Sequence, residues 1–273
     1  MIGGVILKNI IKYLLTFMVP FVVLFIVFRI SVIAGFVLVL AYLIAMFILA
    51  MPSIYKLKGA KSYGRDDDLS EAIKWYEKAY KTGRADTGTG VSLAYLKLKM
   101  GDIEGSEALF KKIYEASSTS NDFRNIIKSN IALIKWKKGK LDEAIEMMEA
   151  LITEFRTTNI YGSLGFLYIA KGDFEKALQF NQEAFEYNST NSIILDNLGE
   201  TYYWLEKYDE AEEKYKKLMG NNPKFPEPYY HYGLVLEKLN RNDEAMDMFK
   251  KADTFKTNFL STIGKEQISE KLK

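Results

Sequence analysis

The strongest constraint on the fold is an internal period of about 34 residues. One small residue recurs along the last three quarters of the chain, at spacings of 34, 38, 33, 34 and 34. A second column of small residues lies twelve positions earlier and keeps the same spacings. The two columns are Ala72, Ser106, Ala144, Ala177, Ala211 and Ala245, and Ala60, Ala94, Ala132, Gly165, Gly199 and Gly233. Such a period is typical of arrays that stack one supersecondary unit.

Each unit of the array has the pattern of two helices joined by a turn. Large apolar residues flank the small residue at helical spacing, as Leu198 and Tyr202 flank Gly199. Turn-forming residues such as Gly172-Asp173 separate the two expected helices. One such pair buries too little apolar surface to be stable alone, so neighbouring pairs must stack into a continuous core. The sequence therefore predicts an all-α solenoid.

The copy at 192–225 resembles the tetratricopeptide repeat family. Its matching residues are Leu195, Leu198, Gly199, Tyr202, Tyr208, Ala211, Tyr215 and Pro223. The copy at 158–191 lacks the proline, and Asn181 stands where an aromatic residue is usual. It matches through Tyr161, Leu164, Gly165, Tyr168, Gly172, Phe174, Ala177 and Ala184. Earlier copies depart further, since Ser106 replaces the usual alanine and Lys97 and Lys135 replace the aromatic of the first helix.

The resemblance implies about six helix-turn-helix repeats and a C-terminal capping helix. The expected repeats are 53–86, 87–124, 125–157, 158–191, 192–225 and 226–259. Apolar residues Ile263, Ile268 and Leu272 lie among charged ones in 260–273, as suits an amphipathic helix that covers the last repeat.

The N-terminal 52 residues differ sharply from the array. Between Tyr13 and Met51 the only charged residue is Arg29. This stretch is too long for a single membrane span, which needs about 20 residues. We therefore expect a transmembrane hairpin in 1–52, with spans at about 10–28 and 32–51. A single anchor, or a cleaved signal peptide followed by a buried helix, is the alternative.

The charges beside the two expected spans predict the topology. Lys8 and Lys12 precede the first span, and Lys56, Lys58 and Lys61 follow the second. The positive-inside rule then places both ends in the cytoplasm. The expected protein is a multi-pass membrane protein whose C-terminal repeat domain is cytoplasmic.

Composition argues against several classes of function. The chain has no cysteine and one histidine, so it offers no thiolate and no multi-histidine metal site. Residues 53–273 hold 34 of the 37 basic residues and all 35 acidic ones, without the basic excess of a nucleic-acid-binding domain. The Thr82–Gly90 stretch lacks the Gly-Lys-Ser/Thr of a phosphate loop. We expect no enzyme, cofactor, metal, nucleic acid or small-molecule substrate, and we interpret His231 as a polar surface or groove residue.

The resemblance implies that a protein or peptide partner binds in a concave groove lined by the first helix of each repeat. The expected groove residues are Tyr95, Asn130, Trp136, Phe166, Asn197, Glu200, Tyr203, Tyr230 and Glu237. A clamp for a terminal carboxylate is not expected, because its cationic columns hold Gly162, Phe166, Glu227 and Tyr230, and only Asn197 conforms.

Three hypotheses of function follow. The first is a membrane-anchored scaffold or adaptor that binds its partner through the groove. The second is a structural or assembly subunit of a membrane complex that associates mainly through the hairpin. The third is an enzyme or transporter. The array shows no group of catalytic residues, and the expected hairpin has no acidic residue within the membrane.

Overall fold

The computed structural model describes residues 18–66 and 69–273, and this part of the chain is helical with no strand. The first six helices are α2 Val19–Ile30, α3 Val32–Asp66, α4 Leu69–Lys81, α5 Thr87–Lys99, α6 Ile103–Glu115 and α7 Asn121–Lys137. The next four are α8 Leu141–Glu154, α9 Thr158–Lys171, α10 Phe174–Tyr187 and α11 Ser192–Trp204. The last four are α12 Tyr208–Gly220, α13 Glu227–Lys238, α14 Asn242–Asp253 and α15 Lys265–Lys271.

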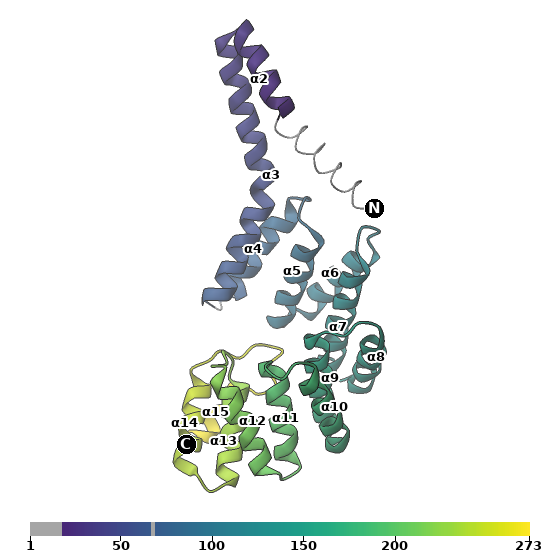
Figure 1. Cartoon of the computed structure of the whole chain (residues 1–273), viewed down its shortest axis with the longest axis vertical. Coiled ribbons are helices and arrows are strands. Elements are labelled where there is room, and N and C mark those ends of the chain that lie inside the picture. Colours follow the sequence, from purple (N-terminus) through teal and green to yellow (C-terminus); the bar gives the residue numbers. More distant parts are fainter. Residues whose placement is uncertain (1–17, 67–68) are drawn as a thin grey trace.

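The helices from the second half of α3 onward form a solenoid of antiparallel pairs (Figure 1). Repeat 1 pairs the end of α3 with α4, and repeats 2 to 6 pair α5 with α6, α7 with α8, α9 with α10, α11 with α12, and α13 with α14. First helices also contact the first helices of neighbouring repeats, as α9 contacts α11 and α11 contacts α13. The first helices therefore form one continuous face.

Small residues mark the points where the two helices of a repeat cross. A Cβ atom on Gly199 would lie 2.7 Å from the ring of Tyr215, and one on Gly233 would lie 2.4 Å from the ring of Phe249. In repeat 1 the residue at the crossing is Gly59, where a Cβ would lie 2.6 Å from Tyr76, whereas Ala60 is exposed. The prediction of Ala60 in this column was wrong by one residue, because repeat 1 has one residue more before its second helix.

The turns inside the repeats share one backbone conformation. The residue seven positions after the crossing residue has a positive φ of 87°, 78°, 80°, 59° and 58° at Gly101, Gly139, Gly172, Glu206 and Asn240. Glycine is favoured there because it has no Cβ to clash in the left-handed region. Glu206 and Asn240 are the exceptions, and of the two the glutamate is the less suited to the left-handed region.

The apolar N-terminal segment runs without a break into the first repeat. Helix α3 begins at Val32 and continues to Asp66, so the expected boundary near residue 52 lies inside one helix. Pro52 has no N–H to donate to the Ile48 carbonyl. Arg84, in the loop after α4, lies 3.4 Å from that carbonyl oxygen and donates to it instead. Repeat 1 is thereby attached to the end of the apolar segment.

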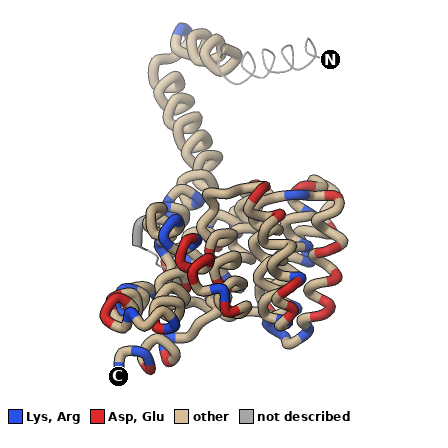
Figure 2. Tube along the Cα trace, turned by 60° about the horizontal axis from the view of Figure 1, so that its bottom comes forward, with Lys and Arg blue, Asp and Glu red and all other residues tan. Residues whose placement is uncertain are grey.

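Within the described residues, one helix is long and apolar enough to cross a membrane, over Val32–Gly64. Helix α2 is apolar but has only 12 residues, and the expected span at 10–28 lies partly outside the described residues. Arg29 is the one charged residue in 19–51, and Figure 2 shows α2 and the outer part of α3 almost free of charge. The two-span hairpin stays a prediction.

The end of the array differs from the expected capping helix over 260–273. Only Lys265–Lys271 is helical, as α15, and Ile268 and Ile263 are buried in the core of repeat 6 beside α14. Residues 255–263 have no regular secondary structure except for isolated turns. We call this segment the strap.

Candidate partner-binding groove

A cavity of about 750 Å³ lies on the face formed by the first helices. Side chains of α5, α7, α9 and α11 line it, together with the start of α13 and part of the strap. Its aromatic residues include Tyr95, Trp136 and Phe166, and its carboxylates include Asp196, Glu200 and Glu227. The cavity thus combines an apolar end near repeats 2 to 4 with an acidic end near repeats 5 and 6.

The structure brings six of the predicted groove residues to this cavity. They are Tyr95, Asn130, Trp136, Phe166, Asn197 and Glu200. The rings of Trp136 and Phe166 meet edge to face with centroids 4.8 Å apart, so neighbouring first helices form one aromatic surface. Both rings are half-buried and keep part of their surface accessible.

The two predicted asparagines hold the backbone of the array as well as lining the cavity. The Asn197 amide donates to the Gly162 carbonyl of α9 at 2.7 Å, across the contact between repeats 4 and 5. The Asn130 amide donates to the Ile126 carbonyl one turn earlier in α7, at 2.8 Å. These bonds use donors that the sequence suggested would be available to a bound peptide. Substitution of either asparagine would therefore disturb the fold as well as the groove.

The other three predicted groove residues lie away from the cavity. Tyr230 is buried in the core of repeat 6, where its ring lies 5.7 Å from that of Phe249. Tyr203 packs against Tyr208 and the same core. Glu237 forms an ion pair with Lys271 of α15, which covers this end of the solenoid. The expectation that these residues face the groove failed because α15 and the sixth-repeat core occupy their surroundings.

A buried charged cluster forms the acidic end of the cavity. The Nδ1 atom of His231 on α13 lies 3.1 Å from Asp196 Oδ1 and 3.8 Å from Glu200 Oε2, both on α11. Burial alone would lower the pKa of His231, but the carboxylates of Glu200 and Asp196 outweigh it and raise this pKa to about 9. The interpretation of His231 as a polar surface or groove residue was wrong, because it is buried as the cationic partner of two acids and does not line the cavity.

Two of the carboxyl groups at this end are themselves perturbed. Burial raises the pKa of Glu200 and of Glu227, since the charged form loses its hydration. Glu227 accepts a hydrogen bond at 3.3 Å from the backbone N–H of Thr262 in the strap. The cluster therefore contacts both neighbouring repeats and the strap.

Asp196, Glu227 and the strap were not predicted to be parts of this site. In the sequence, Asp196 and Glu227 look like ordinary acidic residues on a helix surface. Only the stacking of the repeats brings them together. The strap follows the last recognisable repeat and carries the apolar pair Phe259-Leu260 among polar residues. That isolated pair was the available signal.

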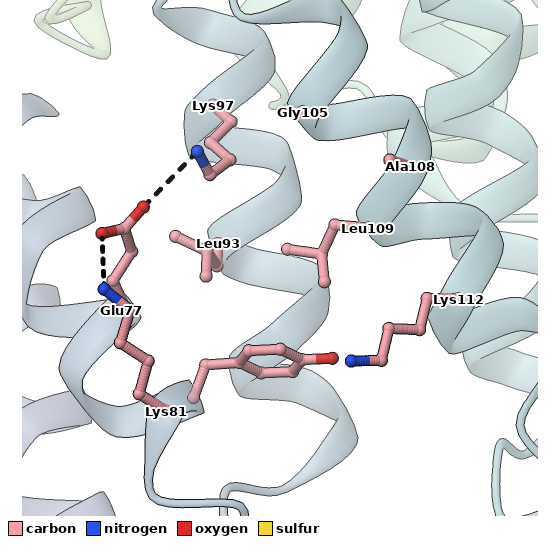
Figure 3. A pocket seen from close by; sticks show the side chains of 9 residues that line it. Glu77, Lys81, Leu93, Lys97, Gly105, Ala108, Leu109 and Lys112 are labelled. Carbon is pink, nitrogen blue, oxygen red and sulfur yellow. Dashed lines mark ion pairs between the residues drawn. The ribbon is translucent and has the colours of Figure 1, made fainter.

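A second, shallower cavity of about 350 Å³ lies between α4, α5 and α6 (Figure 3). Leu93, Leu109 and Tyr80 form its apolar part, and lysines surround them. Glu77 neutralises two of these lysines, at 3.4 Å from Lys97 and 3.8 Å from Lys81. This cavity is a gap between adjacent second helices, and two of the three lysines that line it are paired with Glu77.

Chemistry other than binding finds little support in the part of the chain that the structure describes. No group of three or more His, Asp or Glu side chains there could hold a metal ion. Among the described residues, the polar side-chain partners of His231 are the carboxylates of Asp196 and Glu200. The arrangement suits the binding of an extended segment across several first helices.

Comparison with known proteins identifies the repeats. Models of the tetratricopeptide repeat match residues 127–156 and 158–191, and another such model matches 197–258. The chain thus contains tetratricopeptide repeats in an all-α solenoid, a fold that generally serves protein interaction and not catalysis. No catalytic family is indicated by these matches.

Similar proteins share the repeats over differing lengths. TPR repeat-containing protein MJ1428 of Methanocaldococcus jannaschii is 25% identical over 229 residues, which cover 78% of this chain and 40% of that protein. Tetratricopeptide repeat protein 28 of Homo sapiens is 32% identical over 78 residues, which cover 29% of this chain and 3% of that protein. The chain spans less than half of the length of either relative.

Two solved structures show the same fold. TTC0263, a thermophilic TPR protein of Thermus thermophilus, has a TM-score of 0.53 and 21% identity, covering 61% of this chain and 90% of that one. PilF of Pseudomonas aeruginosa has a TM-score of 0.53 and 11% identity, covering 75% of this chain and 91% of that one. At these identities the likeness concerns the fold alone.

Proposed function

We propose that this protein is a membrane-anchored scaffold that binds an extended segment of a protein partner in the groove of its repeat array. The observation that carries the proposal is the 750 Å³ cavity, which crosses the first helices of four successive repeats. Half-buried Tyr95, Trp136 and Phe166 offer apolar contact from side chains with few rotatable bonds. Cavities with an apolar surface and a few polar groups are the usual sites of recognition.

The membrane part of the proposal rests on exposed apolar side chains. Phe21, Ile33 and Phe36 are 73%, 78% and 65% exposed, and only 6% of the apolar window of α3 is buried. A core helix of a soluble protein would be mostly covered, and an exposed apolar surface of this size needs another covering. Lipid supplies it, and the lysines that follow favour a cytoplasmic array. The predicted first span at 10–28 would complete a multi-pass hairpin.

Groove binding can be tested by filling the cavity without disturbing the core. Ser163 is a half-buried cavity residue of α9, and Ser163→Arg would place a long cation in the space that a partner needs. Thr153→Arg on α8 is the matched control, since Thr153 is exposed and lies outside the cavity. Partners captured from detergent-solubilised membranes with the native chain and the control should be lost with Ser163→Arg.

The alternative function has a distinct outcome in the same experiment. If all three chains capture the same partners, the groove is not their docking surface. Exchange of residues 1–52 for an unrelated hairpin should then abolish capture, as expected of a structural subunit that associates through its apolar segment.

Membrane topology can be tested with single cysteines, because the chain has none of its own. Ser70→Cys lies on the exposed surface of α4, close after the apolar helix. A membrane-impermeant thiol reagent should label it in inverted vesicles and not in intact cells. Labelling of intact cells would reverse the proposed orientation, and loss of the protein from the membrane fraction would overturn the anchor.

A further inference from the structure

The strap crosses from the last repeat to the second one along the groove. It leaves α14 of repeat 6, touches the ends of α5 and α7, and returns to α15. Figure 1 shows it as the yellow-green loop at the edge of the array nearest to α7. Strap residues Leu260, Ser261 and Thr262 line the same 750 Å³ cavity as the groove aromatics. The segment therefore forms part of the cavity wall, beside the surface that a partner would contact.

At repeat 2 the strap satisfies a helix end. The N–H of Phe259 donates to the carbonyl of Lys99, the last residue of α5, at 2.9 Å. Carbonyls in the last turn of a helix lack a donor within the helix. The Phe259 ring packs on Gly101, where a Cβ would lie 3.5 Å from it. Phe259 and Leu260 also pack against the core of repeats 2 and 3, which includes Val91 and Leu98.

The strap also makes polar contacts at repeats 3 and 6. The Lys137 ammonium lies 3.4 Å from the Ser261 carbonyl oxygen, 4.0 Å from the centre of the Trp136 ring and 5.2 Å from that of Phe259. The Thr262 N–H donates to Glu227, as described above. The strap thus uses backbone groups and one aromatic–aliphatic pair, the same means by which an extended peptide would bind.

The ends of the strap, Phe255 and Ile263, pack in the core of repeat 6, but its middle is only partly covered. Phe259, Leu260 and Ser261 are only half-buried, and Thr262 is exposed. Two of its polar contacts with the array, from Lys137 to Ser261 and from Thr262 to Glu227, are 3.3 Å or longer. A segment with such contacts can open locally without unfolding the solenoid beneath it.

We propose that the strap is an internal competitor, which a partner segment must displace by supplying an aromatic–aliphatic pair in place of Phe259-Leu260. This inference rests on the proposed function, since it takes the groove to be the partner site. Because the strap is tethered at both ends, its effective concentration at the site is about millimolar or higher. Partner segments of low affinity are therefore kept out of the groove, and only segments that compete successfully with the strap bind there.

The test uses a fluorescent peptide that covers Thr254 and the strap, residues 254–263 (TFKTNFLSTI), and the full chain in detergent. The Phe259→Ala/Leu260→Ala chain should bind it at least tenfold more tightly than the native chain. A peptide with alanine in both of these positions should bind neither chain. Thr262→Ala is the matched control, because its exposed side chain is removed while its backbone bond to Glu227 stays.

A second measurement needs no substitution and guards against misfolding of the double variant. Hydrogen exchange of the Phe259 amide in the native chain should become faster when the native peptide is added in excess, and not with the alanine peptide. Equal peptide affinities of the native and double-variant chains would overturn the proposal, as would an unchanged Phe259 exchange rate at saturating peptide. Capture that is insensitive to Ser163→Arg would overturn the proposed function alone, because the peptide measurements do not depend on a natural partner.

Discussion

The contact between the first and second helices of a repeat differs between repeat 4 and repeats 5 and 6. In repeats 5 and 6 an aromatic ring, Tyr215 or Phe249, packs directly on a glycine of the first helix. In repeat 4 the equivalent residue is Asn181, which is fully buried and donates to Thr201 of the next repeat at 3.1 Å. Its Oδ1 has no partner and lies where a Cβ on Gly165 would be, 1.9 Å away. The residue at this position can thus pack by dispersion against the first helix, or it can form a hydrogen bond to the next repeat.

The contacts between repeats follow the same division. Repeats 4 and 5 are joined by hydrogen bonds from side-chain amides. Asn181 donates to Thr201, and Asn197 donates to the Gly162 carbonyl. Repeats 5 and 6 are joined by the stacked rings of Tyr215 and Tyr232, 5.5 Å apart, and by the His231 cluster. A polar contact depends on direction and an aromatic one on volume, so the two should respond to different substitutions.

The largest effect is expected at the aromatic crossing. Gly233→Ala would place a Cβ 2.4 Å from the buried Phe249 ring, so the ring or the helices must move. Overpacking of this kind should lower the free energy of unfolding by about 3 kcal/mol. The control is Gly220→Ala in α12, which meets no atom within 4 Å and should be neutral or slightly stabilising. Urea unfolding followed by circular dichroism measures both, and equal midpoints would contradict the close-packing account.

The charged contact between repeats 5 and 6 should make stability depend on pH. The pKa of His231 is raised from 6.5 to about 9, so its stabilising contribution is complete below pH 6.5 and lost as pH rises through 9. Between pH 7 and pH 9 the free energy of unfolding should fall by about 2 kcal/mol, at about 1.4 kcal/mol per pKa unit.

The matched variant for this pH dependence is His231→Gln, which cannot carry the charge. Its unfolding free energy should be lower than that of the native chain at pH 7 and should change less between pH 7 and pH 9. Parallel pH profiles of the two chains would show that another group is responsible.

The polar crossing of repeat 4 can be tested by a double-mutant cycle. Gly165→Ala alone should destabilise the chain by about 2 kcal/mol, because its Cβ overlaps Asn181 Oδ1. In the Asn181→Ala background the overlap is gone and the same change should have an effect of less than about 0.5 kcal/mol. The coupling of about 1.5 kcal/mol is obtained from four urea unfolding curves. Additive effects would mean that Asn181 moves away at no cost.

The smallest effect is expected in a turn. Glu206 has a φ of 59° where the turns of repeats 2, 3 and 4 have glycine. Glu206→Gly should therefore raise the free energy of unfolding by about 0.5–1 kcal/mol, because the left-handed strain is relieved. Asn240→Gly should raise it by less, since asparagine tolerates this region. Thermal unfolding distinguishes them, and a lower midpoint for Glu206→Gly would contradict the account.

The sequence was sufficient for the fold because the repeat signal is local. Small residues at the crossings and glycines in the turns recur at fixed spacing, and each has a steric reason within its own repeat. The register failed in repeat 1, where Gly59 and not Ala60 lies at the crossing. The regular period favoured Ala60, because it cannot reveal the one extra residue that repeat 1 has before its second helix.

The groove was only partly predictable because it depends on long-range placement. Tyr95, Trp136 and Phe166 could be assigned from the face of the first helix that they occupy. Tyr230 and Glu237 could not, since α15 and the buried Phe249 decide their surroundings. His231 was misinterpreted for the same reason, because its carboxylate partners lie 31 and 35 residues earlier in the chain.

The continuity of α3 has a mechanical consequence. A helix rises by 1.5 Å per residue, so the stretch from Met51 to Gly64 is a stem about 20 Å long with no hinge loop in it. The stack of Tyr55 on Trp75 and the Lys56–Asp86 ion pair fix the roll of this stem against repeat 1. Tilting or rotating the apolar end therefore turns repeat 1 with it, and the array follows from there. The direction in which the groove opens is set by the angle at which the stem is held.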